Sequence, residues 1–163
     1  MLIRRARPED AAGIAAVMEV IAGERIYSAI DRAWSVEEER RYIESRSPRE
    51  ALFVAVDDDQ GIVGLQNLCL WSSELPSMAH VGHVGTFLLP AWRRHGLGHR
   101  LWVATRAFAH EMAYRKIVIY VRGSNTSAQS FYRSLGFTEC GRLSRQVTID
   151  GVDDDEVVME LFL

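Results

Sequence analysis

The stretch from Val84 to Leu101 constrains the fold of this chain more than any other. It reads Val-Gly-Thr-Phe-Leu-Leu-Pro-Ala-Trp-Arg-Arg-His-Gly-Leu-Gly-His-Arg-Leu. Its apolar, β-prone first part ends at Pro90 and predicts a strand, and the apolar periodicity that begins near Gly96 predicts a helix. Five of the eight residues from 93 to 100 are arginine or histidine. The stretch therefore predicts a strand, a short basic connection and a helix, in that order.

The basic connection has the composition of an anion-binding loop. The first turn of a helix has unpaired N–H groups and a partial positive charge, so the main chain there can hold a pyrophosphate. Gly96 and Gly98 lack the Cβ atoms that would stand between ligand oxygens and these amides. Positive charge would come from the neighbouring side chains Arg93, Arg94, His95 and Arg100. The sequence therefore predicts a phosphate-binding loop at the start of this helix.

Two common phosphate-binding loops do not fit the spacing of this connection. A P-loop requires Gly-Lys-Ser or Gly-Lys-Thr, which the stretch lacks. The dinucleotide-binding fingerprint requires a third glycine where this chain has Leu101, and it opens a βαβ unit that is not expected here. The stretch does contain Arg-x-x-Gly-x-Gly, directly after Leu-Leu-Pro.

That hexapeptide, from Arg93 to Gly98, resembles the acetyl-CoA loop of the GCN5-related N-acetyltransferases, the GNAT family. A second segment, from Asn125 to Phe137, reads Asn-Thr-Ser-Ala-Gln-Ser-Phe-Tyr-Arg-Ser-Leu-Gly-Phe. It is similar to the family's Asn-x-x-Ala-x-x-Phe-Tyr-x-x-x-Gly-Phe. The two motifs have the family's order, with a predicted helix and strand between them. On both motifs together, the chain is identified as a member of this family.

The pattern of the chain fits the fold that the resemblance implies. We expect a single α/β (α+β) domain over residues 1–163, with a central mixed, mostly antiparallel sheet of about seven strands flanked by about four helices on both faces. The expected strands span about 2–6, 51–56, 62–71, 78–89, 116–121, 137–148 and 156–162. The expected helices span about 9–22, 35–46, 96–113 and 125–136, the second with Ser35 and Glu38 as a capping box and the fourth capped by Asn125. We expect the acidic run Asp153 to Asp155 in a solvated loop.

The resemblance also implies roles for residues of both motifs. The main chain of the strand before the loop would pair with the pantetheine arm of the coenzyme, and Tyr132 would protonate the coenzyme sulfur. Asn125 would contact the coenzyme or a water beside it, while also serving as a helix cap. Tyr27 and Trp34 lie in the region that forms one acceptor wall in the family, where either could instead only pack. The expected coenzyme-binding residues are Phe87, Leu88, Leu89, Arg93, Arg94, His95, Gly96, Leu97, Gly98, His99 and Asn125.

The sequence does not assign the general base. Several peptide-directed family members carry a glutamate five residues before the motif asparagine, where this chain has Tyr120. Other members use a glutamate or histidine on the strand that enters the loop, and the nearest candidates here are His83 and His80. An imidazole with an ordinary pKa of about 6.5 can accept a proton at neutral pH. We take His83 as the first candidate, with His80, Tyr120 and a water relay as alternatives.

Composition excludes several classes of partner. A formal net charge of −3 argues against nucleic acid, because the basic cluster is local. No apolar run approaches the roughly 20 residues of a membrane-spanning helix, and no signal-peptide core follows the first residues, so we expect a cytoplasmic protein.

The two cysteines, Cys69 and Cys140, lack a Cys-x-x-Cys or metal-binding spacing. We expect both to be buried free thiols, and we expect no metal.

The expected function is an acetyl-CoA-dependent N-acetyltransferase that moves an acetyl group to a primary amine of a small-molecule or amino-acid-like acceptor, directly within a ternary complex. A protein or peptide N-terminus, a polyamine and an aminoglycoside stay open as acceptors. The alternative from another class is a non-catalytic acyl-CoA-binding module, which the absence of the family glutamate favours. A homodimer is expected only because it is common in the family.

Overall fold

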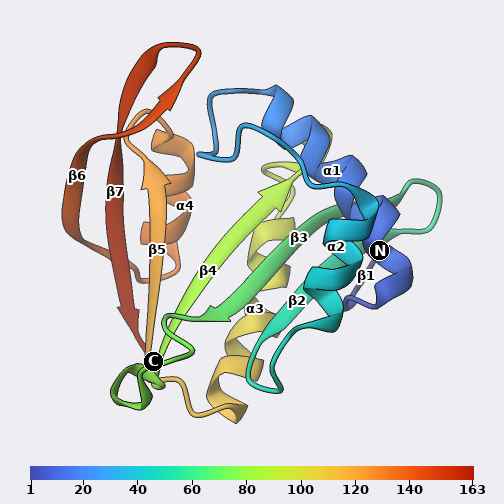
Figure 1. Ribbon diagram of the computed structural model, residues 1–163, viewed down its shortest axis with the longest axis horizontal. Helices are drawn as coiled ribbons and strands as arrows, with labels where there is room; N and C mark the ends of the chain where they lie inside the picture. The colour runs from blue at the N-terminus through green and yellow to red at the C-terminus, as the bar shows by residue number, and fades with distance from the viewer.

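Seven strands in the computed structural model of residues 1–163 form one sheet in the order β1-β2-β3-β4-β5-β7-β6 (Figure 1). All neighbouring strands are antiparallel except β4 and β5, which are parallel. The expected mixed, mostly antiparallel sheet is therefore confirmed. The strands are β1 (Leu2–Arg5), β2 (Ala51–Asp57), β3 (Gly61–Leu70), β4 (Val81–Leu88), β5 (Lys116–Arg122), β6 (Thr138–Ile149) and β7 (Val152–Phe162).

Four α-helices cover the two faces of this sheet. The first pair lies over β2 to β4 on the face turned to the viewer in Figure 1, and the second pair lies behind the sheet. Short 3₁₀ turns at Pro8–Asp10, Pro76–Met78 and Pro90–Trp92 lead into the elements that follow them. The helices are α1 (Ala11–Gly23), α2 (Val36–Glu44), α3 (Leu97–Glu111) and α4 (Thr126–Ser134).

Local capping chemistry explains where two of these helices begin. At α2 the Ser35 hydroxyl accepts a hydrogen bond from the Glu38 amide at 3.2 Å, and the Glu38 carboxylate accepts one from the Ser35 amide at 2.7 Å. At α4 the Asn125 Oδ1 atom accepts a bond from the Ala128 amide at 3.0 Å. Both caps satisfy amides that the first helical turn leaves unpaired, and both predictions are confirmed.

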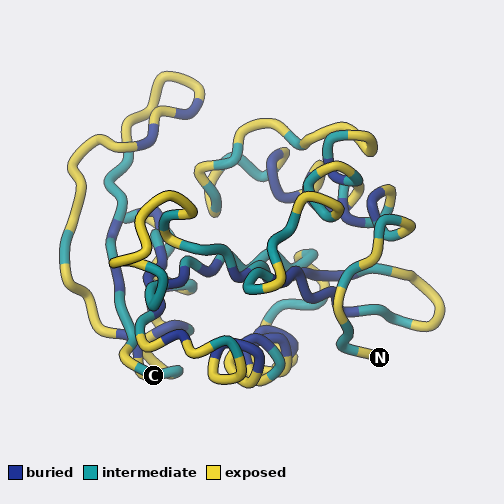
Figure 2. The backbone as a smooth tube through the Cα atoms, turned by 60° about the horizontal axis from the view of Figure 1, so that its bottom comes forward, coloured by how far each residue is buried: buried dark blue, intermediate teal, exposed yellow.

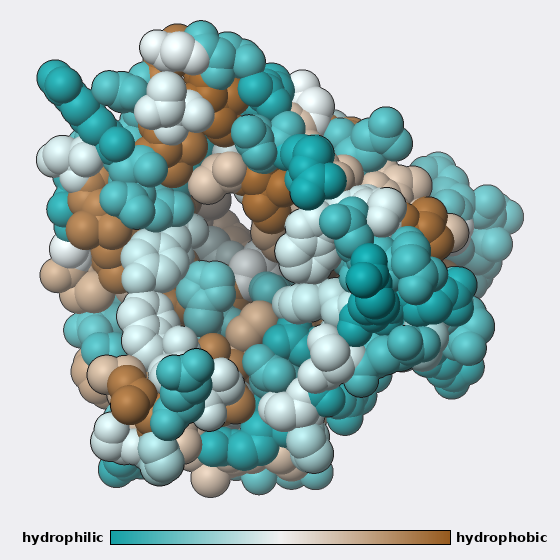
Figure 3. All heavy atoms as spheres, in the orientation of Figure 1, coloured by the Kyte–Doolittle hydropathy of each residue, from teal (hydrophilic) through white to brown (hydrophobic).

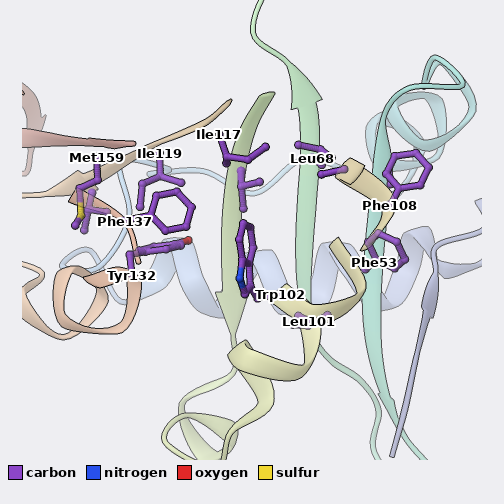
Figure 4. Close-up of a cluster of buried hydrophobic side chains, with 14 of the residues drawn as sticks. Phe53, Leu68, Leu101, Trp102, Phe108, Ile117, Ile119, Tyr132, Phe137 and Met159 are labelled. Carbon is purple, nitrogen blue, oxygen red and sulfur yellow. The ribbon is translucent and has the colours of Figure 1, made fainter. Parts of the chain in front are cut away.

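Each face of the sheet has its own apolar cluster. The larger one lies under α3 and α4 and includes the fully buried Leu101, Ile117 and Met159 (Figure 4). The smaller one lies under α1 and α2 and contains Ile14 among its buried residues. Figure 2 shows that burial is concentrated along the inner strands, while β6 is exposed over most of its length. These clusters therefore hold the inner strands firmly in place, because burying a large aliphatic side chain stabilises a fold by roughly 1.5–3 kcal/mol.

The parallel strands β4 and β5 separate after a short contact. They pair only from Val81 with Lys116 to His83 with Val118, although β4 continues to Leu88 and β5 continues to Arg122. Figure 1 shows the two strands diverging toward the end at which α3 and α4 begin. Beyond His83 the facing edges are therefore unpaired, which leaves a V-shaped opening in the middle of the sheet.

Three expectations about the chain are wrong in detail. The acidic run lies within β7 and not in a loop, because Arg122 and Ser124 donate hydrogen bonds to Asp154 at 2.8 and 2.6 Å. Residues 78–80 do not belong to the strand that became β4, since Met78 ends a 3₁₀ turn. Cys140 is exposed on the edge strand β6 and Cys69 is half-buried, so neither is the buried thiol expected.

Candidate active site at the opening between β4 and β5

The loop from β4 to α3 presents a row of free amides. None of the backbone N–H groups of residues 94–99 donates a hydrogen bond, and α3 begins within this row, at Leu97. Arg94 and Gly96 have left-handed backbone conformations, with φ of 61° and 76°. Such alternating conformations turn successive N–H groups to one side and form a concave anion site. The loop therefore fits a bound diphosphate through main-chain groups alone.

The two glycines of this loop serve different purposes. A Cβ atom at Gly96 would meet no atom within 4 Å, so this glycine is needed for its left-handed conformation. A Cβ atom at Gly98 would lie 3.0 Å from Cζ of Phe131 in α4. We expected Gly98 to make room for the ligand, but its open side is filled by the Phe131 ring. Gly98 therefore allows the helices of the two motifs to pack closely.

The side chain of Arg93 is directed to a partner outside the loop. Its guanidinium donates to both carboxylate oxygens of Glu24, just after α1, and to the Leu88 carbonyl at 3.0 Å. It also lies 4.8 Å above the ring of Tyr27. Arg93 therefore fixes the loop against the segment that follows α1. The remaining basic side chains of the loop are exposed at its outer surface: Arg94, His95, His99 and Arg100.

Tyr132 reaches from α4 to β4 beside the opening. Its hydroxyl lies 2.8 Å from the Thr86 hydroxyl, which accepts a hydrogen bond from the Gln66 side-chain amide at 2.7 Å. Figure 4 shows the phenol oxygen turned toward the middle of the sheet. Burial raises the pKa of Tyr132 to about 12, although the bond from Thr86 lowers it in part. The phenol therefore keeps its proton at any physiological pH.

Asn125 contacts two segments at once. While Oδ1 caps α4, Nδ2 donates to the Tyr27 carbonyl at 2.9 Å. Arg25 reaches the tip of the β6–β7 hairpin, where both nitrogens of its fork bind the Asp150 carboxylate at 2.6 and 2.9 Å. Arg122 donates to the Arg25 carbonyl at 2.6 Å. These contacts hold the segment after α1 across the end of the sheet where β4 and β5 diverge.

The face of the opening that carries α1 and α2 is lined by aromatic rings. The His83 ring lies 5.6 Å from the Tyr120 ring, which is stacked on Trp71 at 5.9 Å. Burial lowers the pKa of His83, so its imidazole is neutral at neutral pH and can accept a proton. His80 precedes β4, and its carbonyl accepts hydrogen bonds from the amides of Arg115 and Lys116, where β5 begins. The structure therefore brings His83 and Tyr120 together and leaves His80 outside the opening.

A polar cluster that no sequence motif indicated lies between α2 and β3. The Tyr42 hydroxyl lies 3.4 Å from the Cys69 sulfur, and the Asn67 side chain donates to that sulfur at 3.3 Å and accepts from the Gly85 amide at 2.6 Å. Trp34 packs edge-on against Tyr42, with ring centroids 5.2 Å apart. This cluster adjoins His83, which pairs with Cys69 across the strands. No local motif marks these residues, since the β3–β4 register assembles them.

No group of three or more histidine, cysteine or acidic side chains is arranged to hold a metal ion. No helix has the length and apolar character needed to cross a membrane.

The candidate site consists of an open strand pair, a row of free amides at a helix start and a buried phenol between them.

Comparison with known proteins is consistent with this geometry. The model of a family described as acetyltransferase (GNAT) family matches residues 19–137. No curated protein matches the sequence.

Three solved structures show the same fold. A ribosomal-protein-alanine N-acetyltransferase from Brucella melitensis is 20% identical over 100% of both chains, with a TM-score of 0.91. A GNAT-superfamily phosphinothricin acetyltransferase from Sinorhizobium meliloti, solved in complex with acetyl-CoA, is 17% identical over 99% of this chain and 88% of its own, with a TM-score of 0.91. A GCN5-related N-acetyltransferase from Kribbella flavida is 25% identical over 99% of this chain and 97% of its own, with a TM-score of 0.86.

Proposed function

Because the chain belongs to the GNAT family of acetyltransferases, we propose that it moves an acetyl group from acetyl-CoA to a primary amine of a small-molecule or amino-acid-like acceptor, directly within a ternary complex. The single observation that carries this proposal is the coincidence of three features at one place. The opening between β4 and β5, the free amides of residues 94–99 and the buried phenol of Tyr132 adjoin one another. Together they match the shape of a thioester on a long arm with a diphosphate behind it.

The coenzyme would be gripped mainly by main chain. The amides from Arg94 to His99 would bind the diphosphate, with the exposed basic side chains of the loop adding charge. The open edge of β4, with the expected residues Phe87, Leu88 and Leu89 at its end, would pair with the amide groups of the pantetheine arm. The Leu88 carbonyl already accepts from Arg93 and the Leu89 amide already donates to the Val63 carbonyl at 3.0 Å, so the arm would use the other main-chain groups of this edge. Asn125 would contact the arm only by exchanging one of the two bonds that its side chain makes in the free protein.

The transfer needs two proton movements. The amine nitrogen forms a bond to the acetyl carbon while the carbon–sulfur bond breaks, the base takes one proton from the amine, and the departing thiolate receives a proton. Tyr132 would donate that second proton, because its raised pKa keeps the phenol protonated. The Thr86 hydroxyl could then donate a hydrogen bond to the phenolate oxygen that remains. His83 would take the first proton, directly or through water, because its neutral imidazole faces the acceptor side.

Release of free thiol from acetyl-CoA across a panel of amines tests the reaction, and calorimetric titration with coenzyme A tests the binding. We expect coenzyme binding, together with thiol release that depends on the amine. Binding without turnover on any amine would favour the non-catalytic acyl-CoA-binding module. That alternative is suggested by Tyr120, which stands where several family members carry a glutamate. We also propose the cytoplasm as the location, on the ground that the enzyme requires acetyl-CoA.

A further inference from the structure

The sheet face in front of β5 and β7 carries a groove that no helix covers. Figure 3 shows this face hollowed between the helices on one side and the last strands on the other. The groove encloses about 310 Å³ beside the opening between β4 and β5. It is mainly apolar, and its lining residues are Trp71, Met78, Val81, Lys116, Val118, Cys140, Val158 and Glu160.

The groove continues into the candidate active site through a flat aromatic shelf. His83 is two residues beyond Val81 on β4, and Tyr120 is two residues beyond Val118 on β5, so both point to the same face as the groove. Trp71 belongs to the groove and is stacked on Tyr120. An apolar or aromatic body lying in the groove would therefore place its nearer end beside His83 and the opening.

One carboxylate on this face has no partner. Glu156 is two residues from Val158 on β7, so its side chain shares the face of the groove. It is half-buried and makes neither a hydrogen bond nor an ion pair, and burial raises its pKa above the ordinary value. Its charge also contributes to the raised pKa of Tyr120, whose main cause is burial. An unpaired carboxylate next to stacked rings has the chemistry of a site for an ammonium group.

The cations beside this face are, in contrast, already paired. Lys116 binds Glu160 within the groove, and Arg122 binds Asp154 at the end of β5. On the other side of the opening, Arg46 binds Glu50 at 2.7 Å. A carboxylate on the acceptor would therefore find no free cation here and would lie near the negative charge of Glu156.

We propose that the acceptor is a primary amine with an apolar or aromatic body and without a carboxylate beside the amino group. Its body would lie against Trp71, and its ammonium would lie over the Tyr120 ring, between Glu156 and His83, and lose its proton to His83 before it attacks the thioester. This inference rests on the proposed acetyltransferase function and narrows its acceptor. It selects simple amines over amino acids among the acceptors that the family resemblance leaves open.

The test compares 2-phenylethylamine with L-phenylalanine, which differ only in the carboxylate. Release of free thiol from acetyl-CoA gives kcat and KM for each. We expect kcat/KM to favour 2-phenylethylamine by at least about tenfold. The carboxylate of L-phenylalanine would be buried without a counter-charge, and the free energy that this costs exceeds what one hydrogen bond to the carboxylate would return. Glu156→Gln should raise KM for 2-phenylethylamine by about tenfold and reduce the preference between the two acceptors.

Glu139→Gln is the matched control, because Glu139 lies on β6 and pairs with Arg133 and Arg142. It should leave both acceptors unchanged, and calorimetry should show the same coenzyme affinity in both variants, so that a loss in Glu156→Gln is not a folding defect. Equal or better turnover of L-phenylalanine, or turnover of alanine with none of 2-phenylethylamine, would overturn the inference and leave the acetyltransferase function standing. Failure to bind coenzyme A, with no thiol release on any amine, would instead overturn the proposed function and the inference with it.

Discussion

The two faces of the sheet are built in different ways. On the face of α3 and α4, the coenzyme side of the proposed site, close apolar packing and main-chain amides shape the site. On the face of α1 and α2, the acceptor side, polar and aromatic side chains from distant parts of the chain lie near His83 and Tyr120, including Tyr42, Asn67 and Glu156. Main-chain chemistry needs only a short local pattern of residues, whereas a surface of side chains depends on strand register.

The largest expected effect tests whether the coenzyme face carries chemistry as well as binding. In Tyr132→Phe we expect kcat to fall about 100-fold, the scale of one general acid, with coenzyme affinity unchanged. Tyr114→Phe is the matched control, because Tyr114 is equally buried in the same cluster and its hydroxyl donates only to the Arg49 carbonyl at 2.9 Å. Steady-state kinetics and calorimetry check both variants, and equal activity of Tyr132→Phe and the parent would remove the phenol from its role.

A single added carbon atom at Gly98 tests the close contact between α3 and α4. Gly98→Ala should destabilise the fold by about 1–3 kcal/mol, the usual range for overpacking, because the new Cβ atom would press on the Phe131 ring. Chemical denaturation measures the loss. Adding Phe131→Leu should recover part of the stability, while Gly23→Ala, at a helical site with free space, should cost nothing. Gly98→Ala without any loss would show that the two motifs are not mechanically linked.

The acceptor face predicts a pH dependence of stability in the acidic to neutral range. Burial raises the pKa of Glu39 on α2 from 4.5 to about 7, with Glu38 adding to the shift. The folded protein therefore binds this proton more tightly than the unfolded chain, and stability falls as pH rises from about 4.5 to 7. Glu39→Gln should remove roughly 1–2 kcal/mol of this loss at pH 8 and change little at pH 4.5. Thermal melts at both pH values check it, and a benefit confined to low pH would contradict it.

The smallest effect concerns the partner of the phenol. Thr86→Val should lower kcat several-fold, less than Tyr132→Phe does, because one hydrogen bond contributes about 1 kcal/mol. Thr105→Val is its control, since the buried Thr105 hydroxyl has no partner and its removal should be neutral or stabilising. Steady-state turnover of the two variants separates the cases. If both lose activity equally, Thr86 does not position Tyr132.

The same contrast explains what could be predicted from the sequence. Local patterns predicted the cap at Asn125, the capping box at Ser35 and the loop before α3, because each depends on neighbours within a few residues. The bond between Thr86 and Gln66 depends on the register of β3 and β4, and no spacing in the sequence reveals it.

Long-range pairing also changed the role of residues that the motifs singled out. Arg93 belongs to the coenzyme loop by pattern, yet its side chain binds Glu24, far away in the sequence. Gly98 fits the motif for a phosphate loop, yet the structure fills its open side with Phe131. The acidic run in β7 looks like a solvated loop until Arg122 draws Asp154 into an ion pair. Sequence alone therefore predicted where the candidate site lies and left its side-chain contacts undetermined.

Titration of the ¹⁵N-labelled protein with coenzyme A, followed by NMR of the backbone amides, tests the central claim most directly. At saturating coenzyme, we expect the amides of Arg94 to His99 to show the largest shifts, together with those of β4 from Val84 to Leu88. Shifts confined to another surface, or no shift at any concentration, would contradict it.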